Sequence, residues 1–268
     1  MPELPEVETV LRTLEKQIKD LKIIDINILY KPIINENITK FKKTLIGQHF
    51  RKFIRRGKYL LFEMDDIVLV SHLRMEGKYF IKNSNEQIEK HTHVIFKLNN
   101  KKDLRYNDVR KFGRFELLEK KDNYDVFKNL GPEPFSNEFS FKYVKNYFNK
   151  LKKPLKEVLL DQSFVSGIGN IYADEICFSI KVKPTTLCYK IKDDTIKDLI
   201  KNTRIILKKA IKAGGTTIRS YTSSLGVTGR FQLKLNVHTM SNCKKCGSKI
   251  KKIRVGGRGT YYCPKCQK

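Results

Sequence analysis

The stretch Gly131-Pro132-Glu133-Pro134 divides the sequence into two parts with different patterns. Two prolines and a glycine within four residues interrupt helices and central strands, so this segment indicates a hinge or domain boundary. Short apolar runs of β type come before it, and apolar residues at helical spacing follow it. A chain of 268 residues is long enough for two domains with separate cores. The sequence therefore predicts an α+β protein with a hinge at 131–137.

The first part, residues 1–130, is predicted to be a β-sandwich with a leading α-helix. An apolar stripe at helical spacing opens the chain, formed by Leu4, Val7, Leu11, Leu14 and Ile18. Pro5 is acceptable because it falls in the first turn. Short apolar runs with polar breaks then predict strands at 23–28, 59–62, 67–70, 93–96 and 115–118.

The second part is predicted to be helical and to end in a cysteine-rich module. Helices are expected at about 138–150, 154–161, 171–179 and 192–213. Residues 214–230 are rich in Gly, Thr and Ser and indicate a long loop, and such loops are often functional. We assign 138–236 to the helical domain, including that loop, and 237–268 to the cysteine module.

The net charge of the chain indicates a polyanionic partner. Its 55 Lys and Arg against 28 Asp and Glu leave a charge of +27, spread along the whole sequence. Compositional drift toward lysine is the alternative explanation of this charge. No apolar run approaches about 20 residues, and the N-terminus is acidic where a secretory signal is basic. We therefore expect a soluble intracellular protein with no membrane partner.

Four cysteines near the C-terminus have the spacing of a metal site. Cys243-x2-Cys246-x16-Cys263-x2-Cys266 places two CxxC pairs within 24 residues. Four thiolates close a tetrahedral shell, so we predict one structural Zn²⁺ and no vacant coordination position. Cys177 and Cys188 lack such spacing and are expected to be buried thiols.

The segment between the two cysteine pairs is predicted to be a basic β-hairpin. Glycines at 256, 257 and 259 mark its bend, and Arg258 lies among them. Such a tip can direct a cation at a phosphate group, although a merely solvated hairpin is also consistent with the pattern.

Pro2 becomes a possible nucleophile if Met1 is removed, because cleavage would expose a secondary α-amine. An α-amine has a pKa near about 7.7–8.0, against about 10.4 for lysine, so part of it is neutral at cellular pH. Proline at position 2 is common, however, and by itself indicates no activity.

Six motifs give that proline a context. They are Met1-Pro2-Glu3-Leu4-Pro5-Glu6-Val7-Glu8-Thr9, Leu73-Arg74-Met75-Glu76-Gly77, Asn107-Asp108-Val109-Arg110-Lys111-Phe112-Gly113, Leu130-Gly131-Pro132-Glu133-Pro134, Gly167-Ile168-Gly169-Asn170-Ile171-Tyr172-Ala173-Asp174-Glu175, and Gly256-Gly257-Arg258-Gly259-Thr260 with the zinc finger. With these motifs in this order, the chain resembles the bacterial formamidopyrimidine-DNA glycosylases over its whole length. The resemblance implies an N-terminal catalytic β-sandwich and a helix–two-turn–helix domain that ends in a β-hairpin zinc finger.

The resemblance also implies a function. The chain is expected to be a bifunctional DNA glycosylase and AP lyase of base excision repair that acts on damaged double-stranded DNA. It would excise oxidised purines such as 8-oxoguanine and formamidopyrimidines through a Schiff base on Pro2, then cut the strand by β,δ-elimination. It would need no redox cofactor, and we expect a monomer in the bacterial cytoplasm, associated with the nucleoid.

Roles follow from the family motifs that this sequence matches. The catalytic set is Pro2, Glu3, Lys58 and Arg258, with Glu6 as a supporting carboxylate. Because a glycosylase must extrude its target base, three side chains are expected to fill the gap and contact the orphan base: Met75, Arg110 and Phe112. The DNA-binding set is His72, His93, Lys156 and Asn170. Residues 214–230 match the lesion-capping loop, with Thr216, Thr217, Arg219 and Tyr221.

Two alternative functions, a possible second metal site and one departure from the family motifs stay open. An endonuclease VIII-like enzyme for oxidised pyrimidines belongs to the same superfamily, and a non-catalytic zinc-containing nucleic-acid-binding protein would also explain the charge and cysteines. His91 and His93 share one face of a strand and raise the question of a second metal site, but no third ligand accompanies them. Val237-His238-Thr239-Met240 stands where family members often have Tyr-Gly-Arg, which leaves the contacts of this linker undetermined.

Overall fold

The computed structural model describes residues 1–120, 127–216 and 229–268 and divides into two compact units. One unit contains Met1–Phe127 and Gly214–Arg230, and the other contains Lys128–Ala213 and Phe231–Lys268. The division falls just before the predicted hinge at 131–137. The described ends of the predicted capping loop belong to the first unit, whereas the sequence pattern placed this loop in the helical domain.

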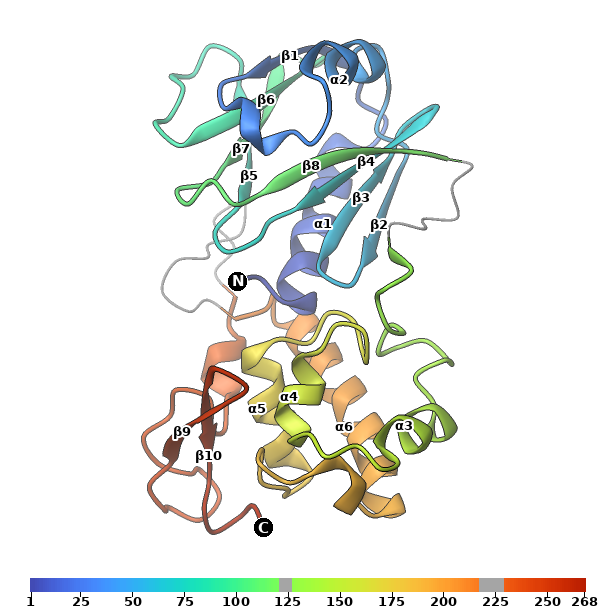
Figure 1. Ribbon diagram of the computed structural model, residues 1–268. Helices are drawn as coiled ribbons and strands as arrows, with labels where there is room; N and C mark the ends of the chain where they lie inside the picture. The colour runs from blue at the N-terminus through green and yellow to red at the C-terminus, as the bar shows by residue number, and fades with distance from the viewer. Residues whose placement is uncertain (121–126, 217–228) are drawn as a thin grey trace. The chain divides into compact units, whose positions relative to one another are not determined.

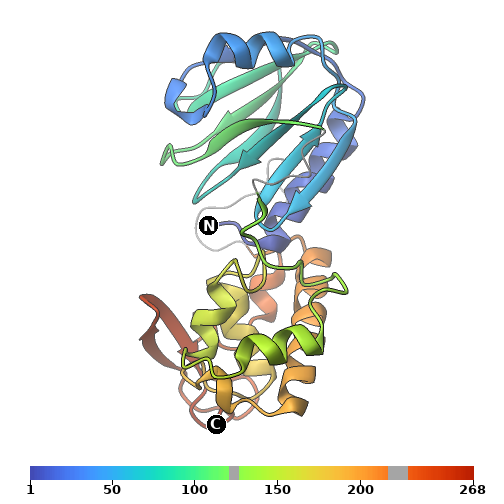
Figure 2. The same cartoon turned by 45° about the vertical axis from the view of Figure 1, so that its right-hand side comes forward.

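The first unit is a sandwich of two antiparallel sheets (Figures 1 and 2). The strand orders are β1-β6-β7-β5 and β2-β3-β4-β8. The strands are β1 (Ile23–Ile28), β2 (Lys52–Arg56), β3 (Tyr59–Glu63), β4 (Ile67–His72), β5 (Lys78–Asn83), β6 (Thr92–Leu98), β7 (Lys102–Asn107) and β8 (Arg114–Glu119). Helix α1 (Leu4–Ile18) packs on β2 and β3, and α2 (Ile38–Leu45) contacts β1. A 3-10 turn, Lys31–Ile33, lies between β1 and α2.

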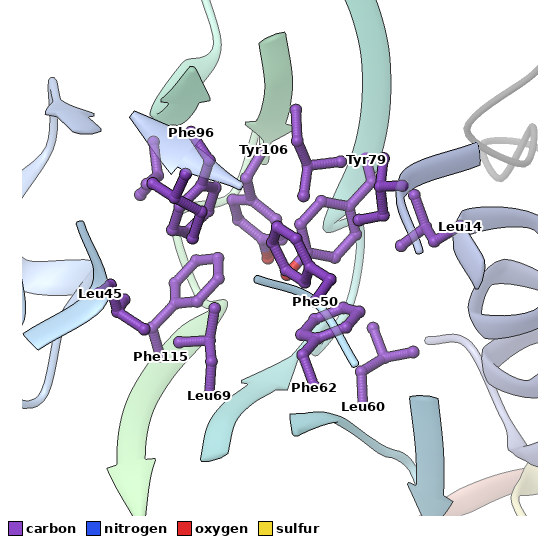
Figure 3. Close-up of a cluster of buried hydrophobic side chains, with 14 of the residues drawn as sticks. Leu14, Leu45, Phe50, Leu60, Phe62, Leu69, Tyr79, Phe96, Tyr106 and Phe115 are labelled. Carbon is purple, nitrogen blue, oxygen red and sulfur yellow. The ribbon is translucent and has the colours of Figure 1, made fainter. Parts of the chain in front are cut away.

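Aromatic rings fill much of the space between the two sheets (Figure 3). Tyr106 lies with its ring centroid 5.2 Å from that of Tyr79 and 5.0 Å from that of Phe115, both with edge-on geometry. Phe62 meets Tyr79 in the same way, with ring centroids 6.0 Å apart. Edge-to-face contacts of this kind stabilise a core beyond the area that the rings bury. The core therefore fixes the strands from which the functional loops project.

Three strands and one helix were not predicted from the sequence. Strands β2, β5 and β7 are rich in charged residues, which masks the alternation of apolar and polar side chains. In β7 the charges are satisfied internally, because Arg105 and Asp103 are buried and form an ion pair of 3.0 Å. A buried ion pair is stable only with such partners, and no local pattern reveals them.

The second unit consists of helices and a zinc-finger hairpin. Its helices are α3 (Phe141–Phe148), α4 (Leu155–Leu160), α5 (Asn170–Ser179) and α6 (Asp193–Lys212), and 3-10 turns occupy Cys188–Lys190 and Phe231–Lys234. Helix α5 packs on α4, on α6 and on β10. The predicted α+β class and its helix–two-turn–helix element are confirmed. No helix in the described part of the chain is long and apolar enough to cross a membrane.

The hairpin of β9 (Lys251–Val255) and β10 (Arg258–Tyr262) depends on two glycines. Val255 pairs with Arg258, so Gly256 and Gly257 form a two-residue turn, with φ values of +52° and +75°. Two-residue hairpin turns of this kind require positive φ at both central positions, which glycine adopts without strain. The turn therefore sets Arg258 at the tip of the zinc finger.

Candidate active site

Glu6 holds the N-terminal residues of the chain in place. Pro2, Glu3 and Glu6 are all buried, and Glu3 directly precedes α1. The Glu3 N–H donates to Glu6 Oε2 at 2.9 Å, while Thr216 donates to Glu6 Oε1 from its backbone N–H at 2.8 Å and from its hydroxyl at 3.1 Å. The carboxylate thus joins the start of α1 to the first residues of the predicted capping loop. Glu6 therefore positions the start of the chain against that loop.

The amine at the start of the chain lies among charged side chains. Burial lowers the pKa of this amine, and the charge of Lys58 lowers it further. Glu3, Glu6 and Glu76 act in the opposite direction, because their negative charges favour the protonated amine. The amine is that of Met1 in the full-length chain, and Pro2 follows it in the buried part of the same segment. This environment increases the neutral, nucleophilic fraction at neutral pH.

Lys58, whose charge acts on that amine, also acts on His72 of β4. Lys58 is 7 % exposed and follows Gly57, whose φ is +57°, in the turn between β2 and β3. His72 ends β4, and its Nδ1 accepts a hydrogen bond of 2.9 Å from the N–H of Arg74. Burial, followed by the charges of Arg74 and Lys58, lowers the pKa of His72 to about 3. The ring is therefore neutral at cellular pH, and its Nε2–H is the donor available to a phosphate oxygen.

The three predicted intercalating side chains lie on two loops of the sandwich. Met75 is half-buried on the loop between β4 and β5, while Arg110 and Phe112 are exposed on the loop between β7 and β8. Phe112 is 47 % exposed, and the guanidinium of Arg110 lies 4.7 Å from its ring centroid. This exposure leaves the Phe112 ring and the neighbouring guanidinium accessible to a partner.

Asp108 shapes the second of these loops, although the sequence pattern assigned it no role. It is 1 % exposed and accepts hydrogen bonds from the backbone N–H groups of Arg110 at 3.0 Å, Phe112 at 2.9 Å and Gly113 at 2.8 Å. A short acidic side chain at the start of a turn often bonds amides a few residues ahead, and this was the signal that could have revealed it.

His93 lies beneath the same loop rather than on the surface. It is 4 % exposed, and its Nε2 lies 2.7 Å from the carbonyl oxygen of Asp108. This placement supports a structural role, and a direct contact of His93 with DNA would need the loop to move. In the described part of the chain no cluster of metal-binding groups includes His91 or His93.

Asn170 begins α5 in the second unit, where the helix–two-turn–helix element turns. Gln162 fixes that turn, because its Oε1 accepts from the N–H of Gly167 at 2.9 Å and its Nε2 donates to the carbonyl of Ile168 at 2.8 Å. Asn170 Nδ2 donates to the carbonyl of Gly259 in β10 at 3.1 Å. The N-terminus of α5 and the zinc hairpin are thus joined, and a helix N-terminus attracts phosphate.

Lys156, which was expected to contact phosphate, is completely buried. Its Nζ donates to Asp174 Oδ1 at 2.7 Å and to the carbonyl of Gly259 at 3.2 Å. Asp174 Oδ2 also accepts from His238 Nδ1 at 2.7 Å and from the N–H of Tyr261 at 3.2 Å. Asp174 therefore connects α4, α5, the linker and β10, and the position of Lys156 supports positioning of the hairpin instead of a direct contact.

Glu175 binds the linker at 237–240, whose sequence departs from the family pattern. Its Oε1 accepts from the backbone N–H groups of Val237 at 2.9 Å and of His238 at 3.0 Å. With His238 also bonded to Asp174, this linker is attached to α5 at two adjacent carboxylates. Neither acidic residue was assigned a role from the sequence, because each lies within a helix and bonds to a linker residue more than 60 positions away.

The four predicted zinc ligands converge in the second unit. The Sγ atoms of Cys243, Cys246, Cys263 and Cys266 lie within 4.8 Å of one another. Those of Cys243 and Cys266 are 3.9 Å apart, and those of Cys246 and Cys263 are 3.5 Å apart. Tetrahedral Zn–S bonds of about 2.3 Å place sulfur atoms about 3.8 Å apart, so the cluster fits one zinc ion. The prediction of a structural zinc is confirmed.

The remaining predicted residues are Arg258 and four positions of the predicted capping loop. Arg258 is exposed at the start of β10. Thr216 is buried and bonded to Glu6, whereas Thr217, Arg219 and Tyr221 lie outside the described residues.

Family models match three consecutive regions of this chain. They are the formamidopyrimidine-DNA glycosylase N-terminal domain at residues 1–115, the H2TH domain of the same family at 130–222, and the zinc finger found in FPG and IleRS at 242–268. Formamidopyrimidine-DNA glycosylases from Ligilactobacillus salivarius and Bacillus subtilis are each 46% identical to it, with 100% of this chain and 99% of each relative covered.

Solved structures of similar proteins include DNA complexes. A Lactococcus lactis Fpg bound to abasic-site DNA has a TM-score of 0.93 at 44% identity, with 99% of both chains covered. A mutant of that protein bound to Fapy-dG-containing DNA has a TM-score of 0.94 at 43% identity, with the same coverage. With all three domain models matched in order and near-half identity over the full length, the chain belongs to the formamidopyrimidine-DNA glycosylase family, the DNA glycosylases of base excision repair.

Proposed function

We propose that this protein excises oxidised purines from duplex DNA with the secondary amine of Pro2, after removal of Met1, and then cleaves the strand as an AP lyase. The environment at the start of the chain carries the proposal. Burial and Lys58 lower the pKa of the Met1 amine, one residue before Pro2, and Glu3 supplies an adjacent carboxyl group. An amine that is neutral near pH 7 can attack carbon, whereas an ammonium cannot.

Pro2 and Glu3 support the first steps of the proposed reaction. Pro2 nitrogen attacks C1′ of the damaged nucleotide, the glycosidic bond breaks with its electron pair going to the base, and the base takes up a proton from solvent. Glu3 takes the proton that the Pro2 nitrogen loses and gives it to the deoxyribose ring oxygen as the C1′–O bond breaks, which opens the sugar and leaves an iminium ion between Pro2 and C1′. Successive β- and δ-elimination then release the 3′ and 5′ phosphates from the sugar.

DNA contacts are proposed for both units. In the first, Lys58 and neutral His72 face the phosphates beside the lesion, while Met75, Arg110 and Phe112 occupy the gap left by the extruded base. In the second, Asn170 and Arg258 bind the backbone. A monomer in the bacterial cytoplasm is consistent with these roles.

Borohydride trapping tests the covalent step. Incubation with lesion-containing duplex and borohydride should give a protein–DNA adduct, and mass spectrometry should show a chain that begins at Pro2. A chain extended at its N-terminus carries Pro2 as an amide without a nucleophilic lone pair, so it should bind the duplex and yield no adduct. An adduct that forms equally well with the extended chain would refute Pro2 as the nucleophile.

The substrate class needs a second measurement. Release of 8-oxoguanine should exceed release of thymine glycol from matched duplexes, whereas the reverse order would identify a pyrimidine-specific enzyme. Salt-dependent binding with no lesion preference and no adduct would instead identify a non-catalytic binding protein.

A further inference from the structure

The two loops that carry Met75, Arg110 and Phe112 are adjacent because of strand pairing. Leu73–Gly77 leads from β4 to β5, and Asp108–Gly113 leads from β7 to β8, so both cross from one sheet to the other. At one end of the loops His72 pairs with Arg114, and at the other end Lys78 pairs with Asn107. Both loops are therefore flanked by residues that face each other directly across a strand pair.

The hydroxyl group of Tyr106 lies between these two loops. Tyr106 is fully buried in β7, where it pairs with Tyr79 of β5 (Figure 3). A Cβ atom added at Gly77 or at Gly113 would collide with the Tyr106 hydroxyl oxygen and would lie 2.8 Å from its Cζ. Neither glycine has a positive φ. At Gly77 the added Cβ would also lie 2.7 Å from the carbonyl oxygen of Leu73, whereas at Gly113 the three nearest atoms all belong to Tyr106. Close contact with Tyr106, and not a positive φ, is therefore what both glycines share.

Each loop is also held internally, so a contact at its glycine affects its tip. Asp108 bonds the amides of Arg110, Phe112 and Gly113, which joins the glycine to both functional side chains. In the other loop the N–H of Gly77 donates to the carbonyl of Leu73 at 2.9 Å and closes a turn around Met75. Tyr106 therefore touches two compact loops at the point where each returns to its strand.

We propose that Tyr106 is a positioning residue that fixes the Met75 loop against the Arg110 and Phe112 loop, so that the three side chains enter the DNA together. The inference rests on the intercalating role proposed above for those side chains. It predicts that base extrusion and reading of the orphan base depend on one buried hydroxyl that contacts no DNA.

Tyr79 supplies a matched control for this hydroxyl. It is also fully buried, its ring contacts that of Tyr106, and its hydroxyl donates to Ser71 Oγ at 2.7 Å within the core. It does not lie between the loop glycines. Tyr79→Phe and Tyr106→Phe each remove one buried oxygen from the same strand pair, so a general effect on core stability should appear in both.

The experiment compares the two variants by stopped-flow fluorescence with 2-aminopurine beside an 8-oxoguanine, and by thermal unfolding. Tyr106→Phe should slow base extrusion about tenfold, because small misplacements of positioning groups strongly reduce rates. It should also weaken discrimination among bases opposite the lesion, while affinity for abasic-site DNA changes less than about twofold. Tyr79→Phe should keep the wild-type extrusion rate. Equal extrusion rates in the two variants would overturn the inference.

A double-mutant cycle with Gly113→Ala tests the contact itself. When Tyr106 is kept, the methyl group introduced by Gly113→Ala meets its hydroxyl, so extrusion should slow. In Tyr106→Phe that oxygen is gone, and the slowing caused by Gly113→Ala should be smaller, although not absent because Cζ remains close. An identical effect of Gly113→Ala in both backgrounds would show that the hydroxyl does not couple the loops.

Alanine variants separate this inference from the function on which it rests. Met75→Ala and Phe112→Ala should each slow extrusion. If neither does, the proposed intercalating role fails whatever Tyr106 does. If both slow extrusion and Tyr106→Phe does not, only the positioning role fails.

Discussion

Lys58 and Lys156 are both lysines with little or no solvent exposure, yet the two regions around them use the positive charge differently. Lys58 follows a glycine in a turn of the sandwich, and its charge lowers the pKa of the nearby amine and of His72. Lys156 is completely buried against Asp174, at the junction of two helices and the zinc hairpin. The first charge adjusts the reactivity of a neighbouring group, whereas the second keeps a segment in place. Burial and partner, rather than residue type, distinguish the two roles.

Removal of zinc should have the largest effect on the region around Lys156, because it unfolds the hairpin that Lys156 positions. Structural zinc contributes about 10–16 kcal/mol of binding free energy in small zinc modules, so chelation should unfold 237–268. DNA affinity should fall by about 100-fold as Arg258 loses its position. Titration of the holoenzyme with a chelator, followed by circular dichroism and DNA binding, measures both. Added zinc should reverse the loss, and unchanged affinity after zinc removal would contradict the assignment.

Lys156→Met should have the next largest effect, on stability. It leaves the Asp174 carboxylate buried without its cation, which costs about 3–5 kcal/mol of unfolding free energy. The double variant Lys156→Met with Asp174→Asn should recover most of this, because the amide oxygen still accepts from His238 and Tyr261. Denaturant unfolding measures the difference.

The single variant Lys156→Met also distinguishes a positioning role of Lys156 from a direct phosphate contact. A phosphate contact predicts unchanged stability and a reduced salt dependence of DNA binding, with a slope lower by about one. Positioning predicts lower stability and a salt slope close to that of the wild type.

Lys58→Met should leave stability nearly unchanged and reduce catalysis. We expect the single-turnover rate of adduct formation to fall about 100-fold at neutral pH. Since Lys58 lowers the pKa of the N-terminal amine, its removal should raise that pKa and move the acid limb of the pH–rate profile to higher pH. In the wild type the rate should rise with pH, and the midpoint of the rise should lie below pH 8.0, the ordinary pKa of an N-terminal amine. An unshifted acid limb in the variant would contradict the electrostatic role.

His72→Gln should have the smallest effect. The folded pKa of about 3 keeps His72 neutral from pH 5 upward, so it adds no inflection to the pH–rate profile. Glutamine keeps an N–H donor, and the rate should change less than about tenfold. In the unfolded chain histidine binds a proton below about pH 6.5, so stability is lost as pH falls from 6.5 toward 3. The variant should lose less stability over that range, and an equal acid sensitivity would contradict a neutral His72.

The fold was predictable wherever local patterns repeat. The apolar stripe of α1, the β-branched strands and the helices of the second unit follow from periodicity, and the CxxC pairs identify the zinc ligands. The charged strand β7 was missed because its ion pair, Arg105 with Asp103, forms only in the folded core. The residues of the candidate site were predicted from the resemblance to a family, whereas their contacts and burial are known only from the structure.

The sequence by itself determined the class of fold, the zinc ligands and the position of Pro2 at the start of a helix, because each depends on residues close together in the chain. Only the tertiary structure decided that Glu6 bonds Thr216, that Lys156 is paired with Asp174, and that Tyr106 lies between Gly77 and Gly113. These contacts join segments 18 to 210 residues apart in the hydrogen-bonded cases, where no short-range pattern can specify the partner. Hydrogen bonds and steric exclusion in the folded state determine which residues become partners.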